Sequence, residues 1–254
     1  MLKISIITVA YNSARTIADT MRSVAAQTYP HIEHIVVDGA SRDDTLDIVK
    51  QYATASTLVQ SEPDKGIYDA MNKGLKLATG DVVGFLNSDD IYADSTTLAD
   101  IAAAFSNNAI QGCYGDLIYV AHDNPQRVIR HWKSCNYKPG LCAKGWMPAH
   151  PTFYVRKAVY EKYGYFDASL KLQADFEMAL RLLDIHGITT QYIPKNLINM
   201  RMGGASNSSI KNIIKGNLEA SNACIKHGLP GGWFFILRKI LSRLPQFLNA
   251  RKFN

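Results

Sequence analysis

Two adjacent carboxylates, Asp89 and Asp90, end a short apolar stretch that reads GFLNSDD. Neighbouring aspartates repel each other unless a positive group lies beside them. Carboxylate oxygens are ligands of hard divalent cations such as Mg²⁺ and Mn²⁺, which proteins often hold with one or two carboxylates and the phosphates of a substrate. The pair therefore indicates a metal–phosphate site. By themselves, the two residues also allow a solvated acidic turn.

Three further apolar runs in the first 90 residues also end in polar or turn-forming residues. The runs KISIITV and HIEHIVV are rich in β-branched residues, which is typical of buried strands. The carboxyl ends of parallel strands meet at one rim of an α/β sheet, where ligands bind. We therefore expect one site, formed by the strand ends Ala10-Tyr11-Asn12, Asp38-Gly39, Ser61-Glu62-Pro63-Asp64 and Ser88-Asp89-Asp90.

Amphipathic helical segments separate these strands. In the first of them, Ile17, Met21 and Val24 share one helical face. Strands that alternate with helices predict an α/β fold, in which a mostly parallel central sheet carries helices on both faces. Beyond residue 92 we expect a helix over 95–105, a strand over 112–120, a loop-rich stretch over 121–150, a helix over 172–186 and a late strand over 188–194.

The composition is that of a globular protein, with 254 residues, 47% hydrophobic and 20% charged. Its four cysteines form no CxxC pair, which argues against a zinc site and a dense disulfide framework. The chain shows no signal peptide, and no apolar window reaches the roughly 18 residues of a membrane span. These features predict a cytoplasmic protein.

The positive charge is concentrated at the C-terminus. No acidic residue follows Glu219, and six of the 28 Lys and Arg residues do, so residues 1–219 hold 22 basic and 22 acidic side chains. A nucleic-acid-binding domain carries its basic patch on the domain itself. The charge distribution therefore argues against a nucleic-acid partner and indicates a neutral domain with a basic tail.

Two common nucleotide-binding motifs are absent. The turn after the first strand reads VAYNSART and contains no glycine, so it does not match a dinucleotide-binding fingerprint. No GxxxxGK[ST] motif occurs, which excludes a P-loop nucleotide triphosphatase.

Five blocks of the sequence, in order, resemble family 2 glycosyltransferases with the GT-A (Rossmann-like) fold. Four resemble the nucleotide-sugar domain of that family: ISIITVAYN, VVDGASRDDT, SEPDKGIYDAMNKGLKLATGD and GFLNSDD. The fifth, LQADFEMALRL, resembles its acidic acceptor-side helix, and SEPDKGIYDAMNKG is particularly similar to bacterial exopolysaccharide and colanic-acid-type transferases. The resemblance implies a domain over 1–222, with a nucleotide-sugar half (3–92) and an acceptor half (93–222), followed by a basic amphipathic extension (223–254).

The resemblance also implies roles at the donor side. Asp90 would bind Mn²⁺ or Mg²⁺, Asp89 would assist at the ribose or a metal-bound water, and Ser88 stands where many relatives carry a third acidic residue. The remaining donor-side residues would border the base, the ribose and the nucleotide pocket; they are Ala10, Tyr11, Asn12, Asp38, Asp64 and Lys65.

On the acceptor side, Asp175 matches the catalytic base and Glu177 is the second choice. His150 occupies an acceptor-side position, and Arg201 would be a charge partner in a loop, RMGGAS over 201–206, that closes over the diphosphate. Without the resemblance, Asp175 would be read as an acid favoured by a helix N-terminus, His150 as structural and the loop as an ordinary surface loop.

The implied activity is inverting, metal-dependent transfer from a UDP- or GDP-sugar to a lipid-linked glycan or polysaccharide. Donor sugar, acceptor and oligomeric state stay open. A nucleotidyltransferase with a similar sheet, and a sugar-nucleotide-binding module without activity, are the alternatives.

Residues 233–248 predict an amphipathic helix that Pro245 kinks or ends. Its basic residues favour peripheral contact with the inner face of the membrane. A helix packed on the domain or on a second copy is the alternative. On a helical projection one face carries Trp233, Leu237, Ile240, Leu241, Leu244 and Leu248.

Overall fold

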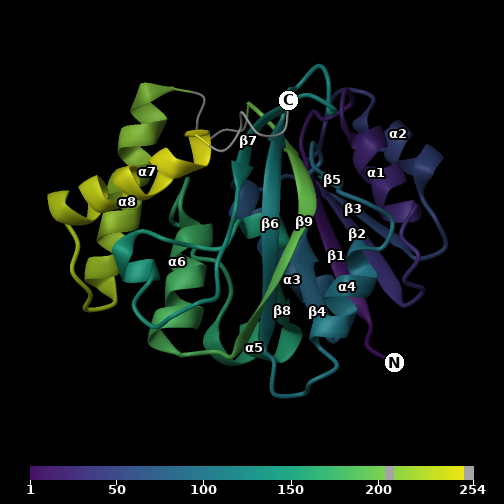
Figure 1. Cartoon of the computed structure of the whole chain (residues 1–254). Coiled ribbons are helices and arrows are strands. Elements are labelled where there is room, and N and C mark those ends of the chain that lie inside the picture. The colour runs from purple at the N-terminus through teal and green to yellow at the C-terminus, as the bar shows by residue number, and fades with distance from the viewer. Residues whose placement is uncertain (204–208, 249–254) are drawn as a thin grey trace.

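A computed structural model of the chain describes residues 1–203 and 209–248, except for the side chains of Ile210 and 242–248. Over these residues one nine-stranded sheet runs in the order β3-β2-β1-β4-β8-β6-β9-β5, with β7 paired to β6 (Figure 1). The strands are β1 (Ile4–Ala10), β2 (Ile32–Asp38), β3 (Thr57–Ser61), β4 (Val82–Phe85), β5 (Ile91–Tyr92), β6 (Gly112–Val120), β7 (Val128–Trp132), β8 (Tyr154–Arg156) and β9 (Thr190–Arg201).

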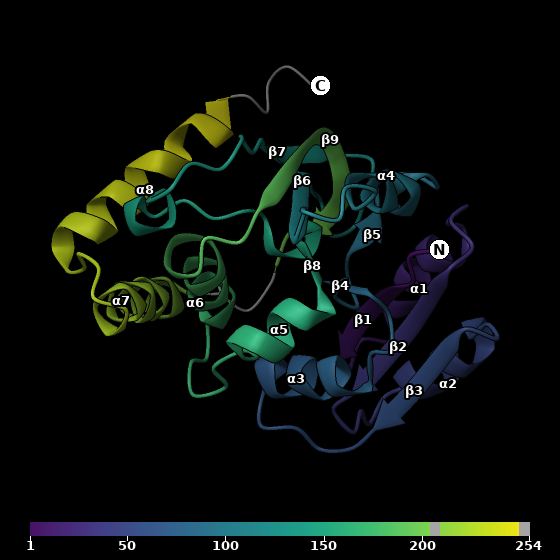
Figure 2. The ribbon, with the colours of Figure 1, turned by 90° about the horizontal axis from the view of Figure 1, so that it is seen from below.

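Helices cover both faces of the sheet, as expected for this α/β fold (Figure 2). All seven residues of β1 are buried. Its side chains alternate between the faces: Ile7 and Val9 pack with residues of α3, whereas Ile4 and Ile6 pack with residues of α4. The helices are α1 (Ile17–Ala25), α2 (Thr45–Tyr52), α3 (Ile67–Leu77), α4 (Thr97–Ala104), α5 (Lys157–Tyr163), α6 (Ala174–Leu180), α7 (Ile210–Lys226) and α8 (Trp233–Leu248).

The sheet changes character at β4. Strands β1 to β4 are parallel, as the alternating sequence pattern predicts. Beyond them, β8 runs antiparallel to both β4 and β6, whereas β9 runs parallel to β6. The strand predicted over 112–120 is confirmed as β6 and the helix predicted over 95–105 as α4.

Strand β7 lies within the stretch 121–150, which the sequence predicts to be rich in loops, and is the strand that the prediction did not place there. The sequence VIRHW is short and shows no long alternation, so its local pattern is weak. It becomes a strand by pairing with the long β6, where Leu117 faces Trp132. Tertiary pairing thus supplies what the local sequence lacks.

A close approach between Gly84 and Tyr154 joins the two halves of the sheet. A Cβ atom on Gly84 would lie only 2.0 Å from the Tyr154 ring, so no larger residue fits there without a shift of the ring. The Tyr154 hydroxyl lies 2.6 Å from the hydroxyl of Tyr92, and both side chains are buried. The stretch that leads to Asp89 is therefore packed against the second half of the domain.

The C-terminal helices pack on the domain, on the side away from α1 and α2 (Figures 1 and 2). The boundary predicted between 222 and 223 falls inside α7. Helix α8 is confirmed over 233–248 and continues past Pro245. It buries Phe235, Ile236 and Lys239, and the Phe235 and Phe176 rings are 5.7 Å apart. Its outer face exposes the apolar side chains of Trp233, Phe234, Leu237, Ile240 and Leu241.

Within residues 1–203 and 209–248, no helix combines the length and the apolar character that crossing a bilayer requires.

Substitutions at two neighbouring phenylalanines test how α8 packs on the domain. Phe235 is 3% exposed and Phe234 is 79% exposed. We expect Phe235→Ala to lower the free energy of unfolding by about 3 kcal/mol, because it removes a buried ring and leaves a cavity. Phe234→Ala should change it by less than about 0.5 kcal/mol, as for other exposed positions. Urea unfolding measures both, and equal effects would contradict this seating of α8.

Candidate active site at the strand ends

The carboxyl ends of the parallel strands lie side by side. The register pairs Ala10 of β1 with Asp38 of β2, and Asp38 with Ser61 of β3. The hydroxyls of Ser13 and Ser88 are 2.8 Å apart and join the loops that follow β1 and β4. Four segments that are distant in the sequence therefore form one rim, as the order of the strands predicts.

The turn after β1 is built around Asn12. Its φ of 49° lies in the left-handed region, which Asn tolerates better than most residues. The Asn12 N–H donates to Ser41 Oγ at 2.8 Å, and the Arg42 N–H donates to Asn12 Oδ1 at 2.9 Å. Asn12 thus fixes the two loops to each other, and Ala10 is buried beneath them.

The Asp38 carboxylate is buried and holds the loop after β2. The Ser41 N–H donates to Oδ2 at 3.0 Å, and the Ser61 hydroxyl donates to the same oxygen at 2.7 Å. The Ser41 hydroxyl donates to Oδ1. Three of the lone pairs of Asp38 are therefore used inside the protein.

Tyr11 and Asp64 converge above Gly39. A Cβ atom on Gly39 would lie 2.5 Å from Asp64 Oδ2 and 3.3 Å from Tyr11 Cδ2, so the approach of both side chains depends on the missing side chain. Tyr11 is 62% exposed, although large aromatic residues usually bury most of their surface. An open aromatic face and a carboxylate therefore lie together at the rim.

Lys65 offers a cation beside Asp64. The Gly66 N–H donates to Asp64 Oδ1 at 2.8 Å, and the Lys65 N–H donates to Asp69 Oδ2 at 2.9 Å, so the backbone of this loop is fixed. The Lys65 side chain is exposed, and its ammonium group makes no ion pair within the described part of the chain. It is available to an anionic ligand.

Asp90 is fully buried and only partly satisfied. Asn87 Nδ2 donates to its Oδ2 at 3.1 Å, whereas its Oδ1 has no hydrogen-bond partner in the described residues. Burial raises the pKa of Asp90 well above its usual value, and the charge of Asp89 raises it further, against the opposing effects of Asn87 and Arg201. Burial also raises the pKa of Asp89, whereas Arg201 and His122 lower it.

Arg201 is the positive group beside the aspartate pair. It is the last residue of β9 and is 4% exposed. Its Nη1 donates to the Asp89 carbonyl at 3.0 Å, and its Nη2 forms an ion pair with Asp19. The predicted contact of Arg201 with a diphosphate would use the same guanidinium. Of the loop predicted over 201–206, residues 204–206 lie outside the described residues.

The aspartate pair fits a hard divalent cation held together with phosphate. A buried carboxylate oxygen without a partner, Asp90 Oδ1, is costly unless a ligand or cation satisfies it. Among the described residues no group of three or more His, Cys, Asp or Glu side chains converges. A cation here would depend on phosphate and water for its other ligands, which suits Mg²⁺ and Mn²⁺ better than zinc.

Asp175 lies at the start of α6 and is tied to α3. The Tyr68 hydroxyl donates to Asp175 Oδ1 at 3.2 Å, and the Phe176 N–H donates to the same oxygen at 2.8 Å. Tyr68 is 8% exposed. The two halves of the domain thus meet at Asp175, since α3 belongs to the first half and α6 to the second.

His150 lies among aromatic rings. Its ring stacks on Phe85 at 5.3 Å and meets Phe166 edge-on at 5.6 Å. Burial lowers the pKa of His150, and the charge of Asp175 raises it. Its Nε2 is buried and has no partner in the described residues. His150 therefore interacts electrostatically with Asp175, and its neighbour Phe166 also stacks on Tyr68, which binds Asp175.

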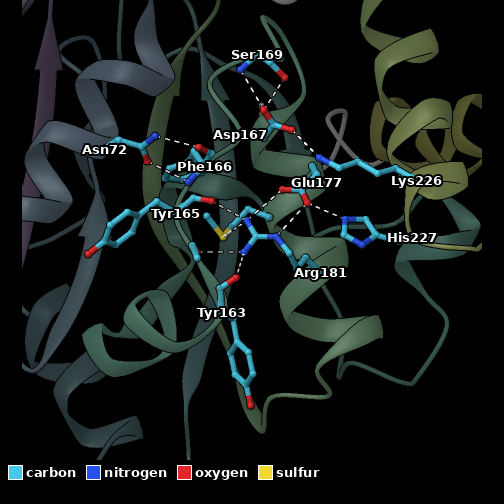
Figure 3. Close-up of polar contacts among 12 residues, drawn as sticks. Asn72, Tyr163, Tyr165, Phe166, Asp167, Ser169, Glu177, Arg181, Lys226 and His227 are labelled. Carbon is cyan, nitrogen blue, oxygen red and sulfur yellow. Dashed lines mark hydrogen bonds and ion pairs between the residues drawn. The ribbon is translucent and has the colours of Figure 1, made fainter.

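Glu177 is held in an ion network instead (Figure 3). It is 2% exposed; Arg181 Nε donates to Oε1 at 3.0 Å, and His227 Nε2 lies 2.7 Å from the same oxygen. Arg181 also donates to the carbonyl of Tyr165 at 2.7 Å. Glu177 thus anchors α6 to its neighbours, and its lone pairs are largely used.

The sequence alone does not predict the contacts of two residues that position the site, Tyr68 and Glu219. Tyr68 stands inside the motif SEPDKGIYDAMNKG, which was a usable signal, but its partner lies 107 residues away. In the sequence, Glu219 is distinguished only as the last acidic residue. It accepts the N–H groups of Lys171, Leu172 and Gln173 at 3.3, 2.8 and 3.2 Å, and so fixes the segment just before α6.

Comparisons of the sequence agree on one family. The model of Glycosyl transferase family 2 matches residues 5–167. A PGL/p-HBAD biosynthesis glycosyltransferase of Mycobacterium bovis is 28% identical over 211 residues, which cover 81% of this chain and 80% of the relative. The putative teichuronic acid biosynthesis glycosyltransferase TuaG of Bacillus subtilis is 43% identical over 90 residues, or 34% of this chain and 36% of TuaG.

Two solved structures share the fold. TarS residues 1–349 of S. aureus, in complex with UDP-GlcNAc, superpose with a TM-score of 0.68 at 19% identity, covering 98% of this chain and 79% of that one. The mannosyltransferase PcManGT of Pyrobaculum calidifontis, in complex with GDP-Man and Mn²⁺, also gives a TM-score of 0.68, at 18% identity, over 98% of this chain and 74% of that one.

Arg201 and Arg22 provide a matched pair of substitutions, because both form ion pairs with Asp19. We expect Arg201→Met to lower the free energy of unfolding by about 3–5 kcal/mol, since it removes the buried cation beside the buried Asp90 and the partly buried Asp89. Arg22 is more than half exposed, so Arg22→Met should cost less than about 1 kcal/mol. Urea unfolding tests this, and a small effect of Arg201→Met would contradict its role.

Proposed function

The chain belongs to Glycosyl transferase family 2, and we propose that it transfers a sugar, with inversion, from a UDP- or GDP-sugar to a lipid-linked glycan or polysaccharide. The observation that carries the proposal is the convergence at one rim of Tyr11, Asp64, the partly buried Asp89 and the buried Asp90, with Asp175 reached from the same rim through Tyr68.

The donor side has the chemistry of a nucleotide site. The exposed ring of Tyr11 offers a face for the base, and the unpaired Lys65 ammonium offers charge to a phosphate. Asp38 shapes the pocket by ordering the loop beneath, and Asp64 faces the ribose. In support, TarS was solved with UDP-GlcNAc and PcManGT with GDP-Man.

Asp90 and Asp89 would hold Mn²⁺ or Mg²⁺, with Asp90 Oδ1 as the protein ligand that lacks a partner. The cation, when bound, neutralises charge on the departing diphosphate. Arg201 holds the backbone of Asp89 in place through its hydrogen bond to the carbonyl. Together with Lys65, it provides positive charge at the phosphate end of the site. The Mn²⁺ in the PcManGT structure supports a metal of this kind.

Asp175 serves as the base. The acceptor hydroxyl loses its proton to the Asp175 carboxylate as its oxygen bonds to the anomeric carbon. The bond between that carbon and the phosphate oxygen breaks, and its electron pair leaves with the nucleoside diphosphate. His150 borders the acceptor with its buried, unpartnered Nε2. Glu177 is the weaker choice of base, because Arg181 and His227 already occupy it.

The names of two relatives support a class of product for the proposed reaction. The M. bovis protein carries the name of a PGL/p-HBAD biosynthesis enzyme, and TuaG that of a teichuronic acid biosynthesis enzyme. Both names support a role of this chain in building a glycan of the cell surface.

Activity and ligand binding test the proposal together. We expect a panel of UDP- and GDP-sugars with Mn²⁺ to raise the Tm for one donor class, by mass action. Asp90→Ala should abolish this metal-dependent shift. Asp175→Asn should keep it and lower transfer by about 10²- to 10⁴-fold, the usual contribution of a general base. A fully active Asp175→Asn protein would rule out the base, and a wild type that turns over no sugar nucleotide would rule out the function.

Helix α8 would bring the enzyme to an anionic membrane, where a lipid-linked acceptor resides. Its outer face exposes Trp233 by 85% and Phe234 by 79%, in a segment without acidic residues. Aromatic side chains favour the membrane interface, and basic residues are drawn to anionic lipid. Because α8 packs on the domain through Phe235, the test must change its outer face and leave the helix in place.

Substitution of the outer face provides that test. We expect the wild type to float with vesicles that contain phosphatidylglycerol and not with pure phosphatidylcholine. The variant Trp233→Ser/Leu237→Ser/Leu241→Ser should lose this binding and keep its Tm. Leu58→Ser/Val59→Ser, which changes two exposed apolar residues of β3, is the matched control and should bind as the wild type does. Unchanged flotation of the triple variant would refute the contact.

A further inference from the structure

The two carboxylate oxygens of Asp175 are not equivalent. Oδ1 accepts two hydrogen bonds, from the Tyr68 hydroxyl at 3.2 Å and from the Phe176 N–H at 2.8 Å. Within the described part of the chain, Oδ2 accepts none. A carboxylate held by one oxygen keeps the lone pairs of the other free for a proton.

We propose that Tyr68 is the positioning residue of Asp175: it binds Oδ1 and thereby leaves Oδ2 as the atom that takes the acceptor proton. This assignment rests on the proposed function, in which Asp175 is the base. The separation of 3.2 Å between the two oxygens is longer than usual for a hydroxyl donor, as is common for catalytic hydrogen bonds before substrate binds.

Tyr68 is itself held firmly in place. Its ring stacks on Phe166 at 5.7 Å with an interplanar angle of 26°. Asn72, one turn later on α3, clamps the Phe166 backbone: its Nδ2 donates to the carbonyl at 2.9 Å, and its Oδ1 accepts the N–H at 3.0 Å (Figure 3). The hydroxyl of Tyr68 is therefore directed by contacts that do not involve Asp175.

The segment that carries Phe166 is anchored from two further sides (Figure 3). Arg181 binds the carbonyl of Tyr165, and Lys226 of α7 forms an ion pair of 2.8 Å with Asp167. The Phe166 ring also meets the ring of Phe85 at 5.2 Å, next to the strand end that leads to Asp89. Through its contact with Phe166, and that of Phe166 with Phe85, Tyr68 thus connects Asp175 to the donor side of the site.

Tyr68 acts only as a donor. Burial raises its pKa well above the usual value, and the charge of Asp175 also raises it, so the hydroxyl stays protonated at every working pH. Among the described residues, His150 is a further titratable group near Asp175, whose charge raises the pKa of His150. Lys239 of α8 contacts the two residues on either side of Ala174 and Asp175: its Nζ donates to Gln173 Oε1 at 2.7 Å and lies over the Phe176 ring. Glu219 of α7 accepts the backbone N–H of Gln173, just before α6.

Tyr68→Phe tests the proposal, since it removes the hydroxyl and keeps the ring. A hydrogen bond to a charged group contributes about 1.5–3 kcal/mol, so kcat should fall about 10- to 100-fold, with the KM of the donor within about twofold of wild type. The acidic limb of the pH–rate profile should move to higher pH, because only the ionised carboxylate loses a hydrogen bond. The assay is release of UDP or GDP from the sugar nucleotide that the wild type turns over.

Tyr29→Phe is the matched control. Its hydroxyl donates to the Leu2 carbonyl at 2.5 Å, at the opposite end of the parallel strands, so its loss should leave kcat and the pH profile unchanged. In the Asp175→Asn background, Tyr68→Phe should cause no further loss of the residual rate, since Tyr68 acts through Asp175.

The outcomes separate the two proposals. A Tyr68→Phe protein with wild-type kcat and pH profile, beside an inactive Asp175→Asn protein, overturns the role of Tyr68 and leaves the base in place. A further loss in the Asp175→Asn background also overturns it. An active Asp175→Asn protein overturns the base assignment itself.

Discussion

The burial of the Asp90 carboxylate, next to the partly buried Asp89 and the buried guanidinium of Arg201, is the constraint on which the rest of the site depends. Asp90 is fully buried and keeps one oxygen without a partner, and Arg201 supplies the nearby positive charge. Because burial of a charge costs folding free energy, the pair destabilises the domain at this point. This cost indicates that the pair is kept for a function. Arg201 ends β9, so a late strand of the chain completes a corner that begins on β4.

The acidic residues of this protein divide into those that build the site and those that remain open in it. Asp38, Glu177 and Glu219 accept hydrogen bonds or ion pairs from several protein groups and thereby fix loops and helices. Asp175 Oδ2 and Asp90 Oδ1 accept nothing from the described residues. The number of lone pairs in use separates the two groups better than the residue type does.

The second half of the domain is organised around the N-terminus of α6, and three other helices reach it. Tyr68 extends from α3, Glu219 from α7 and Lys239 from α8. Helix α8 therefore has two apolar faces, one packed against Phe176 and one exposed. Lys239 on the inner face binds Gln173, the residue before α6, so the proposed membrane contact and the proposed base Asp175 are linked through α8.

The sequence alone determined the alternation of strands and helices and the meeting of the strand ends, because hydrophobic periodicity and turn chemistry are local properties. It also showed that 233–248 is an amphipathic helix. Only the tertiary structure decided which side chains meet across the chain: Arg201 with Asp89 over 112 residues, and Tyr68 with Asp175 over 107. The same holds for β7, which β6 stabilises as a strand, and for Glu177, whose spacing from Asp175 says nothing of Arg181 and His227. Such pairs depend on packing between elements, which no local pattern encodes.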